Sequence, residues 1–283
     1  MSKYIGNGIW RLPTATTTPS TGEDGDCFFD TSTKQLKIKS GNDWGAVTFG
    51  DAYLTLPYTT GLVAHYDGDY MTSTSQTDDS QYTSQTSSPS TWYDRSGNGN
   101  HLSLTNGTGT RWDANVQNGR GAVWFDTSQT YYNRDINKTT DAVTSFIVYA
   151  DHSPSSSSVA AWSMGPSPYF FNWYNNSDNT GRRWETGTSP QADGTSISGS
   201  QQQFWIASGR QQNATNGFNW RWSAGYSFSQ NGQNTGTGTK PFNIGTYAGY
   251  FSGYVCEVLA YDSYLSDADY DLVYNFLRDK WNV

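Results

Sequence analysis

The sequence predicts an all-β fold, an antiparallel sandwich with a small N-terminal β-hairpin segment and one C-terminal helix. Aromatic residues make up 16% of the 283-residue chain, all charged residues only 15%, and there are 29 glycines, a mixture typical of short strands joined by turns. Only three of the 25 acidic residues are glutamates, and aspartate favours turns and caps over helix interiors. We therefore expect very little helix.

Residues 1–50 are predicted to form a separate N-terminal arm and small β-hairpin module. The stretch 14–26, "TATTTPSTGEDGD", has no apolar periodicity and predicts an extended arm or linker. It is followed at 27–47 by an apolar run, a polar turn and a period-two alternation, which predict a hairpin or small meander. Such a unit is too small to be stable alone, so we expect it to pack on the main body or on a neighbouring chain.

Residues 51–283 form the predicted main domain. Its strand candidates share β-branched and aromatic residues bounded by Gly, Asn, Asp, Ser or Pro. The clearest candidates are residues 61–67, 122–126, 144–150, 204–210, 218–228, 242–247 and 253–262. Residues 71–90 offer almost nothing to bury and predict a long exposed loop.

One helix is predicted at the C-terminus, over "LSDADYDLVYNFLRDKW". Ser266 and Asp269 make a weakened capping box, and Leu265 can contact Tyr270 across the first turn. Apolar residues continue at helical spacing, which predicts a packing role. Arg278 and Lys280 are expected at the negative end of the helix dipole.

Charge and cysteine content exclude several classes of protein. The net charge of −8 and the absence of a Lys/Arg cluster larger than Arg182-Arg183 argue against nucleic acid as a partner. No segment has the length of a membrane span or the apolar core of a secretory signal, so we expect a soluble chain with no membrane insertion. Cys27 and Cys256 are far apart in sequence, which favours two reduced thiols over a disulfide.

Three segments, in order, carry a family resemblance. They are "WYDRSGNGNHL" at 92–102, "AVWFDTSQTYYN" at 122–133 leading into the next strand candidate, and residues 253–281. Together they resemble concanavalin A-like lectin/glucanase domains of the laminin-G-like type. The last segment matches that family's C-terminal signature at Glu257, Tyr261, Asp262, Leu265, Ser266, Lys280 and Trp281. The resemblance implies a jelly roll of two antiparallel sheets, which agrees with the strand pattern.

The N-terminal module carries a second, shorter resemblance. The pattern Gly-Asp-x-Phe-Phe-Asp-Thr-Ser-Thr-x-x-Leu-x-Ile at 25–38, followed by a Gly-rich turn and Trp44, is similar to a module of tailed-bacteriophage structural proteins. "KYIGNG" at 3–8 resembles the start of several cyanophage-type proteins. The resemblance implies a virion protein assembled in the bacterial host cytoplasm, attached to other virion proteins through residues 1–50. Display on a virion also implies a homo-oligomer.

Catalytic residues are sparse, so we expect no enzyme. Retaining glycosidases of the resembled fold carry a strand motif with two nearby glutamates, and no two glutamates here are close in sequence. Asp67, Asp69 and His65 have the parity to share one strand face. A strand end running into an Asp-Gly turn explains these residues better than catalysis does.

The loop "TWYDRSGNGNHLSL" at 91–104 has two interpretations. Asp94, Asn98 and Asn100 are weak candidate ligands for a structural calcium ion, because calcium takes six to eight oxygens in flexible geometry. The loop lacks the dense carboxylates of a dedicated calcium site. We therefore favour a turn in which Asp94 and Ser96 bond neighbouring backbone amides and the glycines take positive φ. No other cofactor is expected.

A glycan-binding site is predicted within residues 168–185, where aromatic residues are interleaved with amides and two arginines. The candidate ligand-binding residues are Tyr169, Trp173, Tyr174, Asn176, Arg182 and Trp184. Burial between the two sheets or in a subunit contact explains this stretch equally well. Residues Phe218, Trp220 and Trp222 share one parity and are predicted to be core.

The sequence hypothesis that follows is a non-enzymatic phage virion structural protein, such as a fibre, decoration or adhesion protein. It would display a lectin-like jelly roll that contacts a host-surface glycan. The alternative is a carbohydrate-binding lectin or degenerate glycosidase of the same fold.

Overall fold

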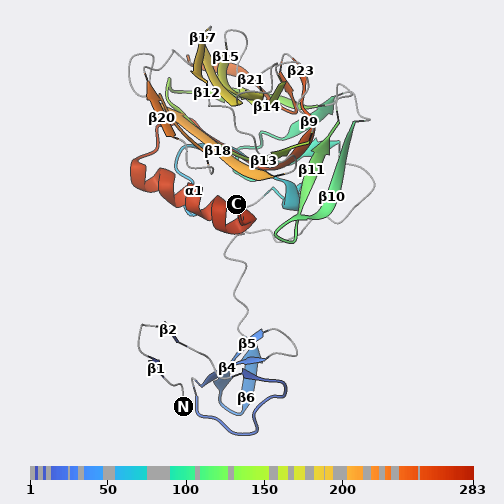
Figure 1. Cartoon of the computed structure of the whole chain (residues 1–283), viewed down its shortest axis with the longest axis vertical. Helices are drawn as coiled ribbons and strands as arrows, with labels where there is room; N and C mark the ends of the chain where they lie inside the picture. Colours follow the sequence, from blue (N-terminus) through green and yellow to red (C-terminus); the bar gives the residue numbers. More distant parts are fainter. Residues whose placement is uncertain are drawn as a thin grey trace. The chain divides into compact units, whose positions relative to one another are not determined.

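The chain divides into two compact units, Met1–Leu54 and Thr55–Val283 (Figure 1). The computed structural model describes residues 4–5, 9–10, 14–24, 26–30, 35–46, 55–74, 90–105, 109–126, 131–152, 159–164, 169–175, 182–187, 189–193, 203–212, 218–222, 227–230, 236–247 and 249–283.

The N-terminal unit contains the predicted meander. The strands β4 (Cys27–Asp30), β5 (Gln35–Ser40) and β6 (Asp43–Ala46) pair in antiparallel order. Buried Phe28 meets the edge of the Trp44 ring at 5.0 Å between centroids. The predicted arm is not wholly irregular, because β3 (Thr14–Ala15) adds a parallel strand beside β4. A short ribbon joins β1 (Tyr4–Ile5) and β2 (Ile9–Trp10).

The body is a sandwich of two eight-stranded sheets whose described pairings are antiparallel. The helix-side sheet runs β10 (Thr110–Gln117), β11 (Arg120–Phe125), β24 (Gly253–Tyr261), β13 (Val143–Asp151), β18 (Phe204–Gln211), β19 (Phe218–Trp222) and β20 (Ser227–Gln230), with β7 (Leu62–Asp67) also paired to β24. The opposite sheet runs β17 (Ser189–Asp193), β16 (Arg182–Gly187), β15 (Tyr169–Asn175), β14 (Val159–Met164), β21 (Gly238–Ile244), β12 (Tyr131–Lys138), β9 (Leu102–Thr105) and β8 (Thr91–Trp92). Strands β22 (Thr246–Tyr247) and β23 (Gly249–Tyr250) form a small ribbon.

Two apolar cores follow from the alternation of side chains along the helix-side sheet. The inner core lies between the sheets and includes Tyr66 and Val258 from one and Trp162 and Phe242 from the other. The second core lies on the outer face of the helix-side sheet, beneath α1 (Figure 1). The body therefore has three layers, and this fold confirms the predicted all-β sandwich with one C-terminal helix.

The helix α1 (Asp267–Trp281) begins where the sequence predicts. Ser266 caps it by accepting a hydrogen bond from the Asp269 amide at 3.2 Å, and Leu265 and Tyr270 are both buried beside it. One expectation about its last turn is wrong. Arg278 is exposed, but Lys280 is fully buried and points into the protein instead of serving the helix dipole from the surface.

The predicted strands at 61–67, 122–126, 144–150, 204–210 and 253–262 match β7, β11, β13, β18 and β24 closely. The candidate at 218–228 is divided between β19 and β20, and much of 71–90 lies outside the described residues. The start of that stretch is not exposed, since Met71 and Ser73 are completely buried. Cys27 and Cys256 are free thiols, as expected. Among the described residues, no helix has the length and apolar character needed to cross a membrane.

Candidate functional site

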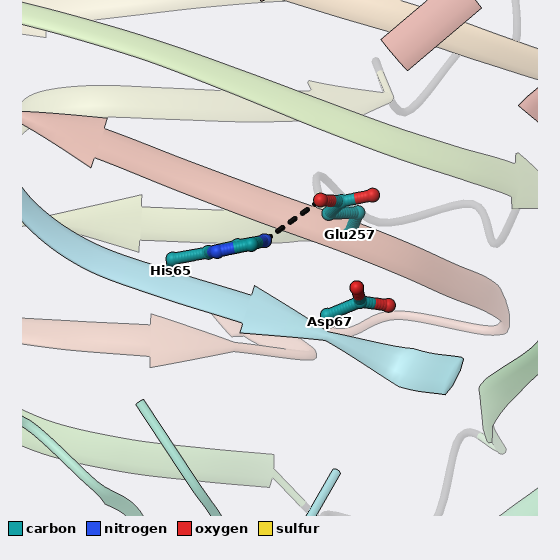
Figure 2. A group of neighbouring side chains, drawn as sticks. All are labelled: His65, Asp67 and Glu257. Atoms are coloured by element: carbon teal, nitrogen blue, oxygen red, sulfur yellow. Dashed lines mark hydrogen bonds and ion pairs between the residues drawn. The ribbon is translucent and has the colours of Figure 1, made fainter. Parts of the chain in front are cut away.

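A cluster of buried charged side chains forms where β7 and β24 meet the end of α1. The antiparallel register places Asp67 directly opposite Glu257, and the period of two puts His65 on the same face of β7 as Asp67. Figure 2 shows these three side chains converging from the two neighbouring strands. Each is at most 1% exposed.

The cluster is held together by the last turn of α1. The Lys280 ammonium lies 2.6 Å from Asp67 Oδ2 and 2.7 Å from Glu257 Oε2. Glu257 also pairs with His65 Nε2 at 2.7 Å and accepts a hydrogen bond from Trp281 Nε1 at 2.6 Å. Glu257 is therefore bound on both oxygens, and β24 is tied to the helix through one side chain.

A second group of ion pairs continues from Asp67 into the turn η1 (Gly68–Tyr70). Asp69 accepts hydrogen bonds from Arg120 Nη1 at 3.0 Å and from the Gly121 amide at 2.8 Å. Arg95 lies 3.6 Å from Asp67 and covers the ring of Tyr70. These pairs join three carboxylates, Asp67, Asp69 and Glu257, to three cations, Lys280, Arg95 and Arg120, so their charges balance.

The pKa values of this cluster follow from burial and from the neighbouring charges. Burial raises the pKa of Glu257, but the Lys280 ammonium and His65 lower it further, so the net pKa lies well below the ordinary value. Burial lowers the pKa of Lys280, but Asp67 and Glu257 outweigh it and leave the pKa raised. Burial and the charge of Asp67 together raise the pKa of Asp69 above its ordinary value. Glu257 and Lys280 are thus held as an ion pair.

The cluster has the residue types of a catalytic or metal site but not the access. The nearest donor atoms of His65, Asp67 and Glu257 lie within 4.8 Å of one another. That is close to the separation of about 5–5.5 Å between the two carboxyl groups of retaining glycosidases. However, the Lys280 ammonium bridges the two carboxylates and occupies the position that a metal ion or a sugar oxygen would need. The arrangement is that of an internal salt-bridge network that fixes the helix.

The predicted parity of His65 and Asp67 on one face is confirmed by the register of β7. Asp69 lies beyond the strand end, in η1, in agreement with the interpretation of a strand that runs into a turn. Lys280 and Arg95 were missed as partners of Asp67. Only the C-terminal signature, which contains both Glu257 and Lys280, could have indicated that these two residues meet.

The loop at 91–104 places Asp94 at its centre. The Asp94 carboxylate is fully buried and accepts hydrogen bonds from the amides of His65, Ser96 and Asn100 at 2.9–3.0 Å, and from the Ser96 hydroxyl at 2.7 Å. Both carboxylate oxygens are therefore used by the protein itself.

The two asparagines of this loop face the backbone of β7 and the residues just before it. Asn98 Nδ2 donates to the Leu62 carbonyl and Asn100 Nδ2 to the Val63 carbonyl, each at 2.8 Å. Gly97 and Gly99 have positive φ, as the turn interpretation expects. These contacts have the geometry of a corner that anchors β7, whereas a calcium ion held by Asp94, Asn98 and Asn100 stays a prediction.

The predicted glycan residues lie on β15, on β16 and in the segment between them. The register places Trp173 opposite Trp184, and opposite Trp162 of β14 on its other side. Tyr174 pairs with Arg183 in the same ladder. Side chains of the candidates on β15 and β16 lie outside the described residues, as do Asn176 and the side chains of Phe218, Trp220 and Trp222. These residues remain candidates on the sequence pattern alone.

No protein-family model and no curated protein matches this chain. Solved structures share its fold. Domain 4 of AbnA, a GH43 extracellular arabinanase from Geobacillus stearothermophilus in complex with arabinotriose, aligns with a TM-score of 0.51 and 14% identity, over 75% of this chain and 98% of that one.

Two larger enzymes align with comparable scores. A GH54 α-L-arabinofuranosidase gives a TM-score of 0.52 and 16% identity over 66% of this chain. A mutant of Trypanosoma rangeli sialidase displaying trans-sialidase activity gives 0.50 and 10% over 90% of this chain. This chain spans 50% and 44% of their respective lengths. These likenesses establish the fold, a β-sandwich of the kind found in carbohydrate-active proteins.

Proposed function

We propose that this protein is a non-catalytic, lectin-like carbohydrate-binding protein. The observation that carries the proposal is the state of the buried cluster. The fold brings Asp67 and Glu257 together at a spacing suited to glycosidic chemistry, but Lys280 neutralises both carboxylates and helix α1 closes them off from solvent. A general acid must meet the glycosidic oxygen directly, and these groups have no route to it.

The sugar-binding half of the proposal draws support from the fold and from the composition. A domain of this fold is known in complex with arabinotriose, and the alignment covers nearly the whole of that domain. The chain also contains 12 Trp and 20 Tyr residues, the side chains whose flat faces and polar edges suit sugar rings. Fold alone does not assign a ligand, so the sites must be tested directly.

We further propose that the carbohydrate-binding body is displayed on a phage virion and that residues 1–50 attach it. The support is the resemblance of residues 25–44 to a module of phage structural proteins, and the division of the chain into a small N-terminal unit and a large body. In this arrangement the body would contact a host-surface glycan while the N-terminal unit contacts other virion proteins.

The proposal is tested with the full-length chain on a glycan array and in parallel hydrolysis assays. We expect selective binding to one class of glycan, with no release of reducing sugar from any glycan that is bound. Reducing-sugar release that follows the protein through purification would instead identify a glycosidase. The absence of binding to every glycan on the array would contradict the lectin assignment.

A further inference from the structure

A row of side chains crosses five neighbouring strands on the outer face of the helix-side sheet. The registers pair Arg111 of β10 with Trp124 of β11, Trp124 with Tyr254 of β24, Tyr254 with Ala150 of β13, and Ala150 with Phe204 of β18. Directly paired residues lie on the same face of a sheet. We call these five residues, Arg111, Trp124, Tyr254, Ala150 and Phe204, the outer row.

The face of the outer row is fixed by the residues that alternate with it. Trp112, Val123, Tyr149, Trp205 and Val255 each precede or follow a member of the row, and all five belong to the inner core. The members of the row must therefore point away from the opposite sheet. Figure 1 shows that α1 lies against this same face, and that β10 and β11 form the edge of the sheet.

The aromatic rings of the row are packed together but are not buried. Trp124, Tyr254 and Phe204 are all partly exposed. The Trp124 ring meets Tyr254 edge to face at 4.8 Å between centroids, and it meets the partly exposed His152 in the same way at 4.7 Å. The small side chain of Ala150 lets the rings of Tyr254 and Phe204 approach to 6.1 Å above it.

The β10 end of the row is polar and charged. Arg111 lies over the Trp124 ring and pairs through Nε with both oxygens of Asp113 at 2.9–3.0 Å. The Tyr254 hydroxyl donates to the same carboxylate at 2.7 Å. The side chains of Arg111 and Asp113 are 49% and 26% exposed. A charged pair and a phenol hydroxyl, all reaching solvent, are thus fixed beside the aromatic rings.

We propose that the outer row, with Asp113 and His152, is a binding platform for a neutral oligosaccharide. The inference rests on the proposed carbohydrate-binding function and gives that function a location. Ring carbons of a sugar would pack on Trp124, Tyr254 and Phe204, and its hydroxyls would exchange hydrogen bonds with Arg111 and Asp113.

The dimensions and the charge of the platform select this class of ligand. Five neighbouring strands at about 4.8 Å spacing make a row of about 19 Å, which suits several sugar rings in succession better than a single one. Arg111 and Asp113 neutralise each other, and the chain as a whole carries a net charge of −8. An acidic glycan would therefore find no excess positive charge and would be repelled at long range.

The test compares the full-length wild-type chain with three variants. Trp124→Ala removes the central ring, and Asp113→Asn removes the charge while keeping the shape. Tyr264→Ala is the matched control, because Tyr264 is a partly exposed ring outside the row that also lies beneath a guanidinium, that of Arg210 at 4.7 Å. Binding is measured by fluorescence titration with arabinotriose and with the neutral and sialylated oligosaccharides that the wild type binds on the array.

We expect Trp124→Ala and Asp113→Asn each to weaken binding of a neutral oligosaccharide by at least about tenfold, whereas Tyr264→Ala binds as the wild type does. If Trp124→Ala fails to fold, Asp113→Asn decides the result. A wild type that binds while both row variants bind equally well overturns the platform and leaves the lectin proposal standing. Preference for sialylated glycans overturns the neutral ligand. A wild type that binds nothing contradicts the proposed function itself.

Discussion

Replacing Lys280 by methionine tests whether the buried cluster fixes helix α1. Methionine has a similar length but no charge, so Lys280→Met would leave Asp67 and Glu257 as two neighbouring buried carboxylates without the ammonium that bridges them. Removing one partner of a buried ion pair costs about 3–5 kcal/mol, because the other partner stays buried without compensation. Arg95 and His65 remain beside the two acids, which places the expected loss within that range instead of above it.

The loss is measured by thermal unfolding of the full-length chain. In domains of about 150–250 residues each kcal/mol lowers Tm by about 2–4 °C, so we expect Lys280→Met to lower the Tm of the body by about 6–20 °C. The control is Arg278→Met in the same turn of α1. Arg278 is about half exposed and pairs with Asp279 at the surface, and such pairs contribute less than about 1 kcal/mol.

A double variant makes the test specific for the ion pair. In Lys280→Met/Glu257→Gln the unpaired charge of Glu257 is removed as well, so its loss of stability should be smaller than the sum of the two single losses. Equal losses for Lys280→Met and Arg278→Met, or strict additivity in the double variant, would refute the argument that these side chains act as one network.

Three further predictions concern the acids and the N-terminal unit. Because the pKa values of Glu257 and Asp262 lie below their ordinary values of 4.5 and 3.8, their stabilisation is present above those values and is lost as the pH falls below them. Denaturant unfolding at several pH values should therefore show a weaker acid dependence in Glu257→Gln than in the wild type, and equal slopes would contradict this. Adding calcium should leave Tm unchanged, since both oxygens of Asp94 already accept hydrogen bonds, and a rise would establish a site in that loop. Deleting residues 1–50 should leave a body with unchanged Tm that no longer joins the virion, and normal incorporation would sink the attachment proposal.

The body of the fold could be predicted because its strongest signals are local. Strands β7, β13 and β24 are rich in β-branched and aromatic residues, and α1 has both its cap and its apolar period written in the sequence. Strand β12, "YYNRDINK", was missed, since its charged and amide residues outnumber its apolar ones. It is a strand because only Tyr132, Ile136 and Lys138 need to be buried, while the alternate residues face solvent.

The candidate site could be predicted only in part, because its contacts join residues far apart in the sequence. Parity along β7 put His65 and Asp67 on one face, but nothing local to them points to Lys280, which lies 213 residues from Asp67. The Arg111–Trp124–Tyr254 part of the outer row has the same origin. It exists only after three strands have paired in a particular register, and register depends on the packing of the whole core.

The end of α1 also decides how much of the outer face remains open. Its last carbonyls are taken up by the turn between β10 and β11: the Lys280 carbonyl accepts hydrogen bonds from Asn118 and Arg120, and the Trp281 carbonyl accepts one from Gln117. These bonds and the ion cluster hold the helix terminus at the Gln117–Arg120 end of the hairpin. Arg111 and Trp124 lie in the same two strands on the other side of that end, where the helix does not continue. The residues that secure the helix therefore also leave the outer row partly exposed, and a loss of helix anchoring should change oligosaccharide binding as well as stability.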